Sequence, residues 1–435
     1  MRSLLQVATV LAVVSLLALV MFLRFPLNQR AEDVKAAIET SRQRRANLMV
    51  KATDPKQNGY LSEPFLAFWG SRSHPKPKTP AGTIIETWRG FSTSASETGQ
   101  PIDHQAMATV PEYIQARADF AELWPPLHQA LTRPVFTAAI ERPAFGTDMI
   151  DLVALRQTAQ ALCAWAENAL LEGHPEIAAQ AIGDVIEMGS HVTLDPCLTN
   201  ALLGVSIQAI GFNALVHLLP PETALSPAQW QELAVRVRRS MPPQGQISTL
   251  LEEEIAFAHN SFQDLYQGQS AHPLTKWPWL MRREERVYYN VMTGLLAASH
   301  QDEMVVMPAH LTNPGTASYL TGKTGIVANM MVPDLSKVSA QLLYNRYRMA
   351  AATLVTEILA YRANHHSLPA KLEVEGLGLA PSMVVYEPAE NRLRVEVPAA
   401  VRRVVGHPVV GGPYAATDNF RTSETGFEFT LGNDR

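Results

Sequence analysis

The stretch LTNALLGVSIQAIGFNALVHLL, from Leu198 to Leu219, decides the fold class because its apolar residues keep to one side of a helix. They alternate in steps of four and three positions: Leu198, Leu202, Val205, Ala209, Phe212, Val216 and Leu219. This spacing predicts a helix with a buried face. Asp195 followed by Pro196 predicts its start, because an N-cap carboxylate accepts from free backbone N–H groups and a proline needs no donor there.

Two more helices are predicted just before this stretch. Leu152 to Leu170 and Ile177 to Met188 carry similar apolar stripes, with many alanines that would let helices approach closely. The glycine and proline of Gly173-His-Pro175 suit the end of one helix and the start of the next, so we expect an antiparallel hairpin. This hairpin resembles a tetratricopeptide-type unit, although no sustained repeat follows it.

Composition limits the classes of function. A formal net charge of −5 over 435 residues argues against a nucleic-acid binder, whose phosphate contacts need a basic face. Two cysteines, Cys163 and Cys197, exclude a disulfide-rich scaffold and any metal site made of four thiolates. We expect two buried thiols, with one disulfide bridge as the alternative if the domain is exported.

The amino-terminal segment Leu4 to Leu23 is almost entirely apolar and matches the hydrocarbon thickness of a bilayer. It runs directly into Arg24 without a small-residue cleavage site, which favours an uncleaved single-pass anchor in the cytoplasmic (inner) membrane over a signal peptide. A short amino end with Arg2 favours a periplasmic or otherwise extracytoplasmic body. The basic residues that follow the segment favour the opposite, cytoplasmic-facing orientation: Arg24, Arg30, Lys35 and Arg42.

The remaining pattern predicts a mostly α fold: a bundle body of α-helical hairpins, then a small carboxyl-terminal antiparallel sheet packed on a long helix. Helices are expected at Pro111 to Leu131, from Ser226, and at Leu335 to His365; strands are expected at Met383 to Tyr386, Leu393 to Val397 and Phe427 to Leu431. The expected divisions are a transmembrane anchor (4–23), a charged helical neck (24–52), a loop-rich linker (53–110), an α-helical domain (111–270), a mixed helix and loop segment (271–334), and the long helix with its sheet (335–435).

The junction between the long helix and the sheet carries a second resemblance. Tyr361-Arg-Ala-Asn-His-His-Ser-Leu-Pro369 resembles the helix-to-sheet joint of type II secretion pseudopilin-like domains. His366 and Ser367 replace the glycine of that joint, and Asp434 alone does not provide that family's calcium ligands. Together with the anchor and the helical hairpins, the chain resembles uncharacterised bacterial membrane-anchored proteins, which implies a fold and a location but no activity.

The most enzyme-like cluster consists of Glu252, Glu253, Glu254 and His259. We expect a solvated acidic face here, with catalysis by Glu254 or His259 as the alternative if another helix supplies a partner. The basic residues Arg42, Arg44 and Arg45 of the neck are likewise expected to be exposed.

Other motifs have simpler interpretations, and no cofactor or metal site is expected. Gly322-Lys-Thr324 lacks the first glycine and the strand of a phosphate loop. Glu187 and His191 make only two metal ligands, and His365 and His366 suit the end of a helix.

The leading hypothesis is a non-enzymatic envelope protein, anchored by its amino-terminal helix, that binds an unidentified protein partner, with a secretion or pilus-like assembly as the suggested setting. The alternatives are an anchored hydrolase with a carboxylate and histidine site between helices, and a scaffold that faces the cytoplasm.

Overall fold

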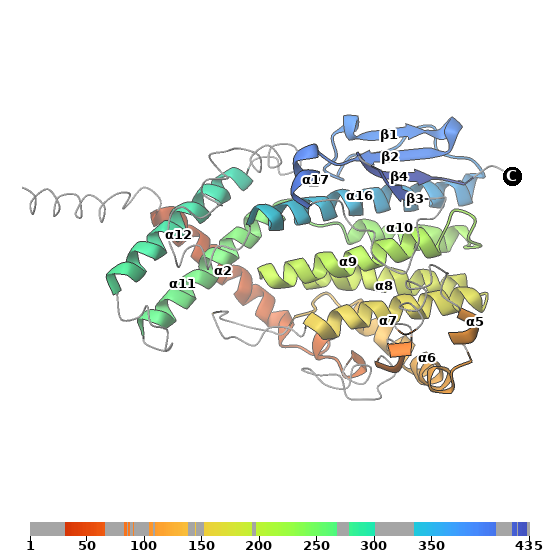
Figure 1. The fold of residues 1–435 in the computed structure, drawn as a ribbon, viewed down its shortest axis with the longest axis horizontal. Helices are drawn as coiled ribbons and strands as arrows, with labels where there is room; N and C mark the ends of the chain where they lie inside the picture. The colour runs from red at the N-terminus through yellow and green to blue at the C-terminus, as the bar shows by residue number, and fades with distance from the viewer. Residues whose placement is uncertain are drawn as a thin grey trace, which may run out of the picture.

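The fold is mostly α-helical with a small antiparallel sheet near the carboxyl end, as the sequence predicts (Figure 1). The structure is a computed structural model that describes residues 31–65, 82–84, 86–87, 90, 104–107, 109–137, 144, 152–193, 197–267, 278–300, 335–405, 420–423 and 425–432. The predicted anchor, Leu4 to Leu23, and the segment Gly322 to Thr324 lie outside these ranges.

The described ranges contain the following helices in chain order. They are α2 (Ala31–Ala52), α5 (His104–Met107), α6 (Pro111–Leu131), α7 (Leu152–Leu171), α8 (Pro175–Thr193), α9 (Leu198–Leu218), α10 (Pro227–Arg239), α11 (Gln246–Tyr266), α12 (Pro278–Ser299), α16 (Leu335–His365) and α17 (Ala399–Val405). Short 3-10 turns cover Gly59–Leu61, Pro381–Met383 and Pro388–Glu390.

Four strands form the sheet in the spatial order β1-β2-β4-β3, and every neighbouring pair is antiparallel. They are β1 (Val384–Glu387), β2 (Arg392–Glu396), β3 (Phe420–Thr422) and β4 (Gly426–Thr430). The pairing of Leu393 with Phe429 and of Val395 with Phe427 sets the register. These four side chains are buried, so one face of the sheet lies on α16 while the alternate residues face outward.

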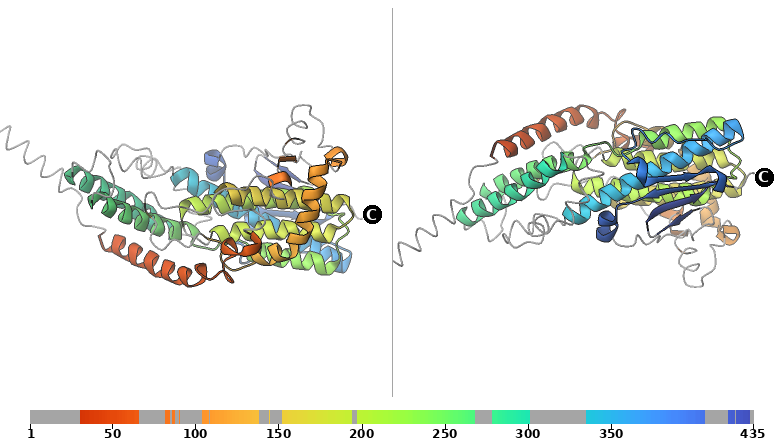
Figure 2. Two further views of the ribbon diagram at one scale, coloured as in Figure 1. Left: turned by 90° about the horizontal axis from the view of Figure 1, so that it is seen from below. Right: turned by 90° about the horizontal axis from the view of Figure 1, so that it is seen from above.

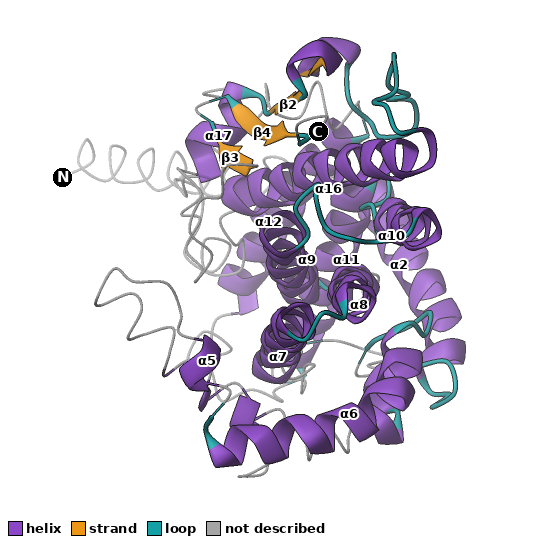
Figure 3. Ribbon diagram, turned by 90° about the vertical axis from the view of Figure 1, so that its right-hand side faces the viewer, coloured by secondary structure: helices purple, strands orange, loops and turns teal. Residues whose placement is uncertain are grey.

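The body is built in layers. The sheet covers α16, α16 packs on α9 and α10, and α7 and α8 pack on the other side of α9, with α6 lying across the bundle beneath them (Figure 3). One continuous hydrophobic core runs from α2 to β4 and joins the helices of ranges 111–270 and 335–435. At one end α2, α11 and α12 extend beyond this body, which makes the molecule elongated (Figure 2).

Helix α9 is the centre of the body, in contact with α7, α8 and α16. Within the described ranges, α9 is the helix that is long and apolar enough to cross a membrane. This is weak evidence for membrane association, because the core helix of a soluble protein can have the same length and composition. More than half of its apolar window is buried here. A helix that is apolar on nearly all sides needs partners on all sides, and the surrounding helices supply them.

Helices α8 and α9 approach each other closely at glycines. A Cβ atom built on Gly204 would lie 2.5 Å from the carbonyl oxygen of Gly189 and 2.3 Å from the Thr193 side chain. The predicted close approach therefore occurs, but at the α8–α9 contact it depends on glycines rather than on alanines.

A polar link ties α9 to its neighbours inside the core. The side-chain amide of Gln208 donates to the carbonyl oxygen of Ser240 at 2.8 Å, and its oxygen accepts from Asn345 at 2.7 Å. Because all three residues are buried, this link fixes α9 relative to α10 and α16.

Several sequence predictions are confirmed residue by residue. Helices α6 and α16 have the predicted bounds, and α10 begins with the capping box of Ser226 and Gln229. Gly173 has a φ of +81° in the turn between α7 and α8, as a helix-ending glycine should. The three predicted strands correspond to β1, β2 and β4.

Other predictions need correction. Helix α9 begins at Leu198 with Cys197 at the N-cap position, and the predicted cap residue, Asp195, lies outside the described residues. The sequence did not indicate β3 or α17, because three and seven residues are too few to show a period. At the end of α16 the expected glycine is replaced by His366, which itself adopts the left-handed conformation with a φ of 55°.

We predict that Gly204→Ala destabilises the protein, because the added methyl group has to push α8 away from α9. The free energy of unfolding, measured by urea denaturation, should fall by about 1–3 kcal/mol. Gly90→Ala is the matched control, since a Cβ atom at that helical position meets nothing within 4 Å. Equal stability of the two variants would contradict the close approach.

Candidate functional site

Glu254 of α11 lies where that helix meets the start of α9. Its carboxylate accepts a hydrogen bond from the backbone N–H of Leu198, the first residue of α9. The first N–H groups of a helix have no partner within the helix, and the N-cap Cys197 supplies no side-chain bond. A carboxylate from a helix distant in the sequence therefore caps the start of α9.

The surroundings of Glu254 change its protonation. Burial, and to a smaller degree the neighbouring charge of Glu253, raises the pKa of its carboxyl group to about 7 against the opposing effect of the hydrogen bond from Leu198. The Glu254 side chain nevertheless keeps part of its surface exposed. A carboxyl group with this pKa can both donate and accept a proton near neutrality, which is the property required of a general acid or base.

His259 lies in a separate network on the α11–α12 hairpin. Its Nδ1 is 3.2 Å from the hydroxyl of Tyr289, and its Nε2 is 2.8 Å from the side-chain nitrogen of Gln263. The side-chain nitrogen of Gln263 can only donate, so Nε2 accepts and the proton of a neutral ring lies on Nδ1. The contact of Nδ1 with Tyr289 joins α12 to α11, whereas the bond of Nε2 lies within α11.

The two candidate catalytic residues are not brought together. Glu254 faces the start of α9, whereas His259 bonds to Tyr289 of α12 and Gln263 of its own helix. Tyr288 donates to the backbone carbonyl of Glu254 at 3.1 Å, so it does not contribute a second group to the carboxylate. The described part of the chain therefore assembles no carboxylate–histidine pair from Glu254 and His259.

The expectation of a solvated acidic face is wrong for the carboxylates next to Glu254. Glu253 is 2% exposed and accepts from Arg45 Nε at 2.8 Å and from Arg44 Nη1 at 2.9 Å. Arg44 also donates to Glu252 at 2.5 Å. We call these four residues the α2–α11 clasp, because they join the neck helix to the body.

The expectation that Arg44 and Arg45 are exposed is wrong for the same reason. Arg45 is only 6% exposed, and the side chain of Arg44 is partly covered. The sequence predicts that arginines on a weakly apolar helix are solvent-exposed. It does not show their acidic partners, because these lie more than 200 positions away. Only the packing of α2 on α11 brings them together.

A second buried ionic cluster, which was not predicted from the sequence, joins α6, α8 and α10. Asp184 is fully buried and accepts from Arg236, which also donates to Glu187 at 2.8 Å. His128 of α6 lies 2.8 Å from an oxygen of Asp184, and this hydrogen bond raises the pKa of His128. The cluster is a closed arrangement of opposite charges, which is typical of a joint between helices.

Metal binding by Glu187 and His191 has no support in this geometry. Glu187 already accepts a hydrogen bond from Arg236 at 2.8 Å. Among the residues that the structure describes, no group of three or more potential ligands is placed to hold a metal ion.

The cysteines and the histidines at the end of α16 have structural roles. Cys163 and Cys197 are both buried free thiols, so the alternative of a bridge between them is not realised in this structure. His365 bonds to the carbonyl oxygen of Tyr361 at 2.9 Å and stacks on its ring, which fits the predicted role at the helix end.

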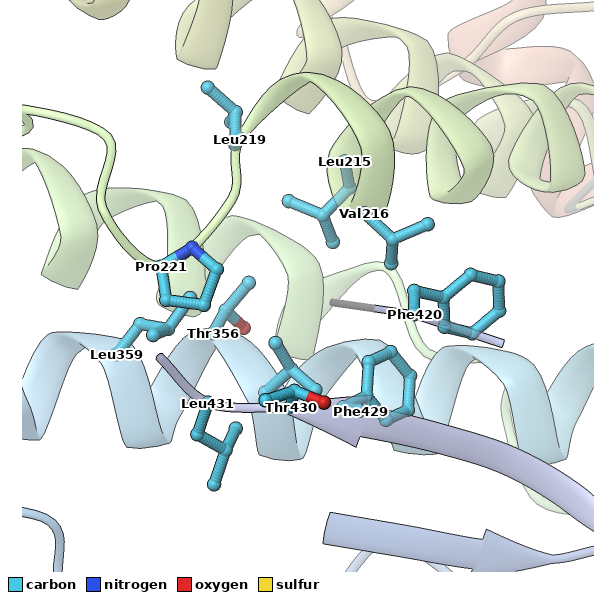
Figure 4. A pocket seen from close by; sticks show the side chains of 11 residues that line it. Leu215, Val216, Leu219, Pro221, Thr356, Leu359, Phe420, Phe429, Thr430 and Leu431 are labelled. Carbon is cyan, nitrogen blue, oxygen red and sulfur yellow. The ribbon is translucent and has the colours of Figure 1, made fainter. Parts of the chain in front are cut away.

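An apolar pocket lies between the end of α9, the middle of α16 and the strands β3 and β4 (Figure 4). Leu215, Leu359, Phe420 and Phe429 are among its lining residues. Its cavity volume is only about 20 Å³. Pockets for metabolites are more than ten times larger, so this pocket is a packing defect between the sheet and the helices.

Comparison with known proteins adds no functional information. No protein-family model, no curated protein and no solved structure matches the chain.

We predict that Glu253→Gln strongly destabilises the protein, because it leaves Arg44 and Arg45 without their buried counter-charge. The free energy of unfolding should fall by about 3–5 kcal/mol in urea denaturation. Glu32→Gln is the control, because the Glu32–Lys35 pair is exposed, and its effect should stay within about 0.5 kcal/mol. If both variants lowered the free energy of unfolding by equally small amounts, the structural importance of the clasp would be contradicted.

We predict that Glu254→Gln changes how stability depends on pH. The folded pKa of about 7 lies above the ordinary 4.5, so Glu254 stabilises the fold fully below pH 4.5 and loses that contribution as the pH rises through 7. Relative to the wild type, the variant should gain up to about 3 kcal/mol across this window. Unfolding measured at several pH values tests the prediction.

Glu428→Gln is the control for that experiment, because the pKa of Glu428 is shifted in the opposite direction from that of Glu254. The hydrogen bond from Arg421 lowers the pKa of Glu428, so its contribution is present at neutral pH and is lost in acid. The stability of Glu428→Gln should therefore approach that of the wild type as the pH falls. If the difference between Glu254→Gln and the wild type were the same at every pH, the raised pKa of Glu254 would be refuted.

Proposed function

We propose that this protein is a non-enzymatic, membrane-anchored envelope protein whose helical body binds another protein. The observation that carries the proposal is the α2–α11 clasp, which joins the helix that follows the predicted anchor rigidly to the body. A flexible tether would not need buried charges. A stiff neck instead fixes the height and orientation of the body above the membrane, as an assembly component requires.

The dimensions of α2 support this reading. Its 22 residues span about 33 Å, and α11 packs along it. With the anchor in the bilayer, this length would hold the layered body away from the lipid surface, where a protein partner can reach it.

The sheet end of the molecule supports the suggested setting in a secretion or pilus-like assembly. A long helix, α16, runs into a small antiparallel sheet that folds back onto it, in the order that the resemblance to pseudopilin-like domains implies. The outer sheet face carries cross-strand ion pairs such as Arg421–Glu428 and Arg392–Glu428. These exposed pairs keep the sheet soluble and leave the partner site to the helical body.

One observation favours the second candidate, an anchored hydrolase. Glu254 has a pKa of about 7 and a partly exposed side chain, which suits a proton-transfer role. We rank this candidate second because the carboxylate already bonds to Leu198, and because the described pocket is far from it.

We predict that the carboxyl terminus is exported. Two carboxyl-terminal fusions test this, one to a reporter active only outside the cytoplasm and one to a reporter fluorescent only inside it. Activity of the first reporter alone is the expected result. Fluorescence of the second reporter alone would overturn the proposed envelope location. It would favour the alternative of a scaffold that faces the cytoplasm.

Photocrosslinking in living cells then tests partner binding. Photoreactive residues replace, one at a time, the exposed apolar residues Ile114, Leu171 and Val235 of the body, with exposed Val50 of the neck as the control position. A product of defined mass from a body position, absent at Val50, is expected. Recovery of the monomer alone at all three positions, together with loss of function in Glu254→Gln without any loss of thermal stability, would favour the hydrolase instead.

A further inference from the structure

The ionic cluster around Asp184 contains unequal numbers of opposite buried charges. Asp184, Glu187 and Arg236 are all buried, so two carboxylates share one guanidinium. His128 also bonds to the cluster, because its Nδ1 lies 2.8 and 2.9 Å from the two carboxylate oxygens of Asp184. A protonated His128 therefore brings the net charge of these four groups to zero. A neutral His128 leaves one negative charge uncompensated inside the protein, which is costly.

The electrostatic surroundings favour the protonated ring of His128. The hydrogen bond with Asp184 raises its pKa above 6.5, and Glu187 acts in the same direction, against the effects of burial and of Arg236. Burial raises the pKa of Asp184, and His128 and Arg236 oppose that change. The charge of His128 is thus the one in this cluster that is expected to change on the alkaline side of neutrality.

Two prolines divide α6 into an amino half and a carboxyl half. Pro125 and Pro126 lie inside the helix and have no N–H to bond to the carbonyl groups four positions earlier. Both prolines are exposed, so no side chain packs over them as it would in the core. A helix that lacks these bonds bends most easily at this point.

The amino half of α6 is held on α7 without His128. The hydroxyl of Tyr113 accepts a hydrogen bond from Asn168, and the ring of Phe120 packs edge-on against Trp165 with 4.8 Å between the centroids. All four residues are buried. Burial raises the pKa of Tyr113 to about 12, so none of these contacts depends on a proton that leaves near neutral pH.

The carboxyl half of α6 is connected to the chain that follows α2. Gly59 packs so closely on the carbonyl oxygen of Ala130 that a Cβ atom would not fit there. The side-chain nitrogen of Asn58 donates to the carbonyl oxygens of Ala52, the last residue of α2, and Thr137, each at 2.8 Å. The position of this half of α6, which lies across the bundle in Figure 3, therefore bears on the end of the neck helix.

We propose that His128 and Asp184 form a proton-dependent latch between α6 and α8. With His128 protonated, the carboxyl half of α6 is held on α8. With His128 neutral, this half moves about Pro125 and Pro126 and loosens the chain at the end of α2. The inference goes beyond the proposed function, because it requires neither the anchor nor a partner.

The direction of the pH dependence follows from linkage. Contact with Asp184 raises the pKa of His128 above its ordinary value of 6.5, so the contact stabilises the latched state fully below pH 6.5. That stabilisation is lost as the pH rises through the raised value. Each unit by which the pKa in the latched state exceeds that in the open state changes the equilibrium about tenfold.

Hydrogen–deuterium exchange on the full chain tests the latch at about pH 6 and about pH 9, on either side of the histidine range. Labelling times are scaled so that an unstructured peptide exchanges equally at the two values. We expect peptides that cover residues 127–137 and 53–61 to lose protection several-fold at the higher pH. Peptides that cover residues 111–120 should keep theirs, because the amino half stays on α7.

Variants assign the effect to the latch. In His128→Gln the peptides of residues 127–137 should exchange equally at both pH values, at the rate of the unmodified protein at the higher pH. His174→Gln is the matched control and should keep the pH difference, because the side chain of His174 is 54% exposed in the turn before α8. Glu254 titrates in the same range, but its effect at the start of α9 would persist in His128→Gln.

Two further measurements keep the test decisive if His128→Gln does not fold. Asp184→Asn balances the remaining charges of Glu187 and Arg236, so it should exchange slowly at both pH values. In the unmodified protein, the NMR titration of the His128 ring should have the same midpoint as the change in exchange. Equal protection of residues 127–137 at both pH values, equal loss in both halves of α6, or a His128 midpoint below 6.5 would each overturn the latch.

Discussion

The buried carboxylate of Glu253 is the constraint on which the position of the neck depends. A carboxylate that is 2% exposed is stable only with opposite charges beside it, and Arg44 and Arg45 supply them from another helix. Helix α2 has few apolar residues with which to pack, so apolar burial alone would hold it weakly. The ion pairs therefore decide both where α2 lies and how firmly it stays there.

Consecutive residues of α11 connect three parts of the molecule. Glu253 holds α2, and Glu254 bonds to the first N–H of α9, the helix at the centre of the body. Neighbouring positions on a helix point about 100° apart, so one turn of α11 can serve two partners. Helix α2 is thus tied through a single turn of α11 to the helix at the centre of the body.

The same chemistry explains why clusters that look catalytic in sequence are structural in three dimensions. Carboxylates, histidines and arginines recur at the joints α2–α11, α6–α8–α10 and α11–α12. In each joint most polar groups already have a partner, which leaves few of them free to act on a substrate. Glu254 is the exception of interest, because its raised pKa and partial exposure keep it available for proton exchange.

The sequence by itself determined the helices whose apolar stripes and end signals agree. The bounds of α6 and α16 and the capping box of α10 follow from local rules, because periodicity, proline and cap residues act within a few positions. It did not determine β3 or α17, which are too short to show a period, nor the cap of α9, which comes from Glu254 on another helix.

Only the tertiary structure decided the state of the charged residues. Glu253, Arg44 and Arg45 were expected to be solvated because a sequence does not show a partner more than 200 positions away. The Asp184 cluster was missed because its partners, 52 and 56 positions away, lie on other helices. Apolar periodicity is a local property, whereas the pairing of charges is set by which helices pack together. The sequence therefore predicted the individual helices, but it did not predict the ion pairs that join one helix to another.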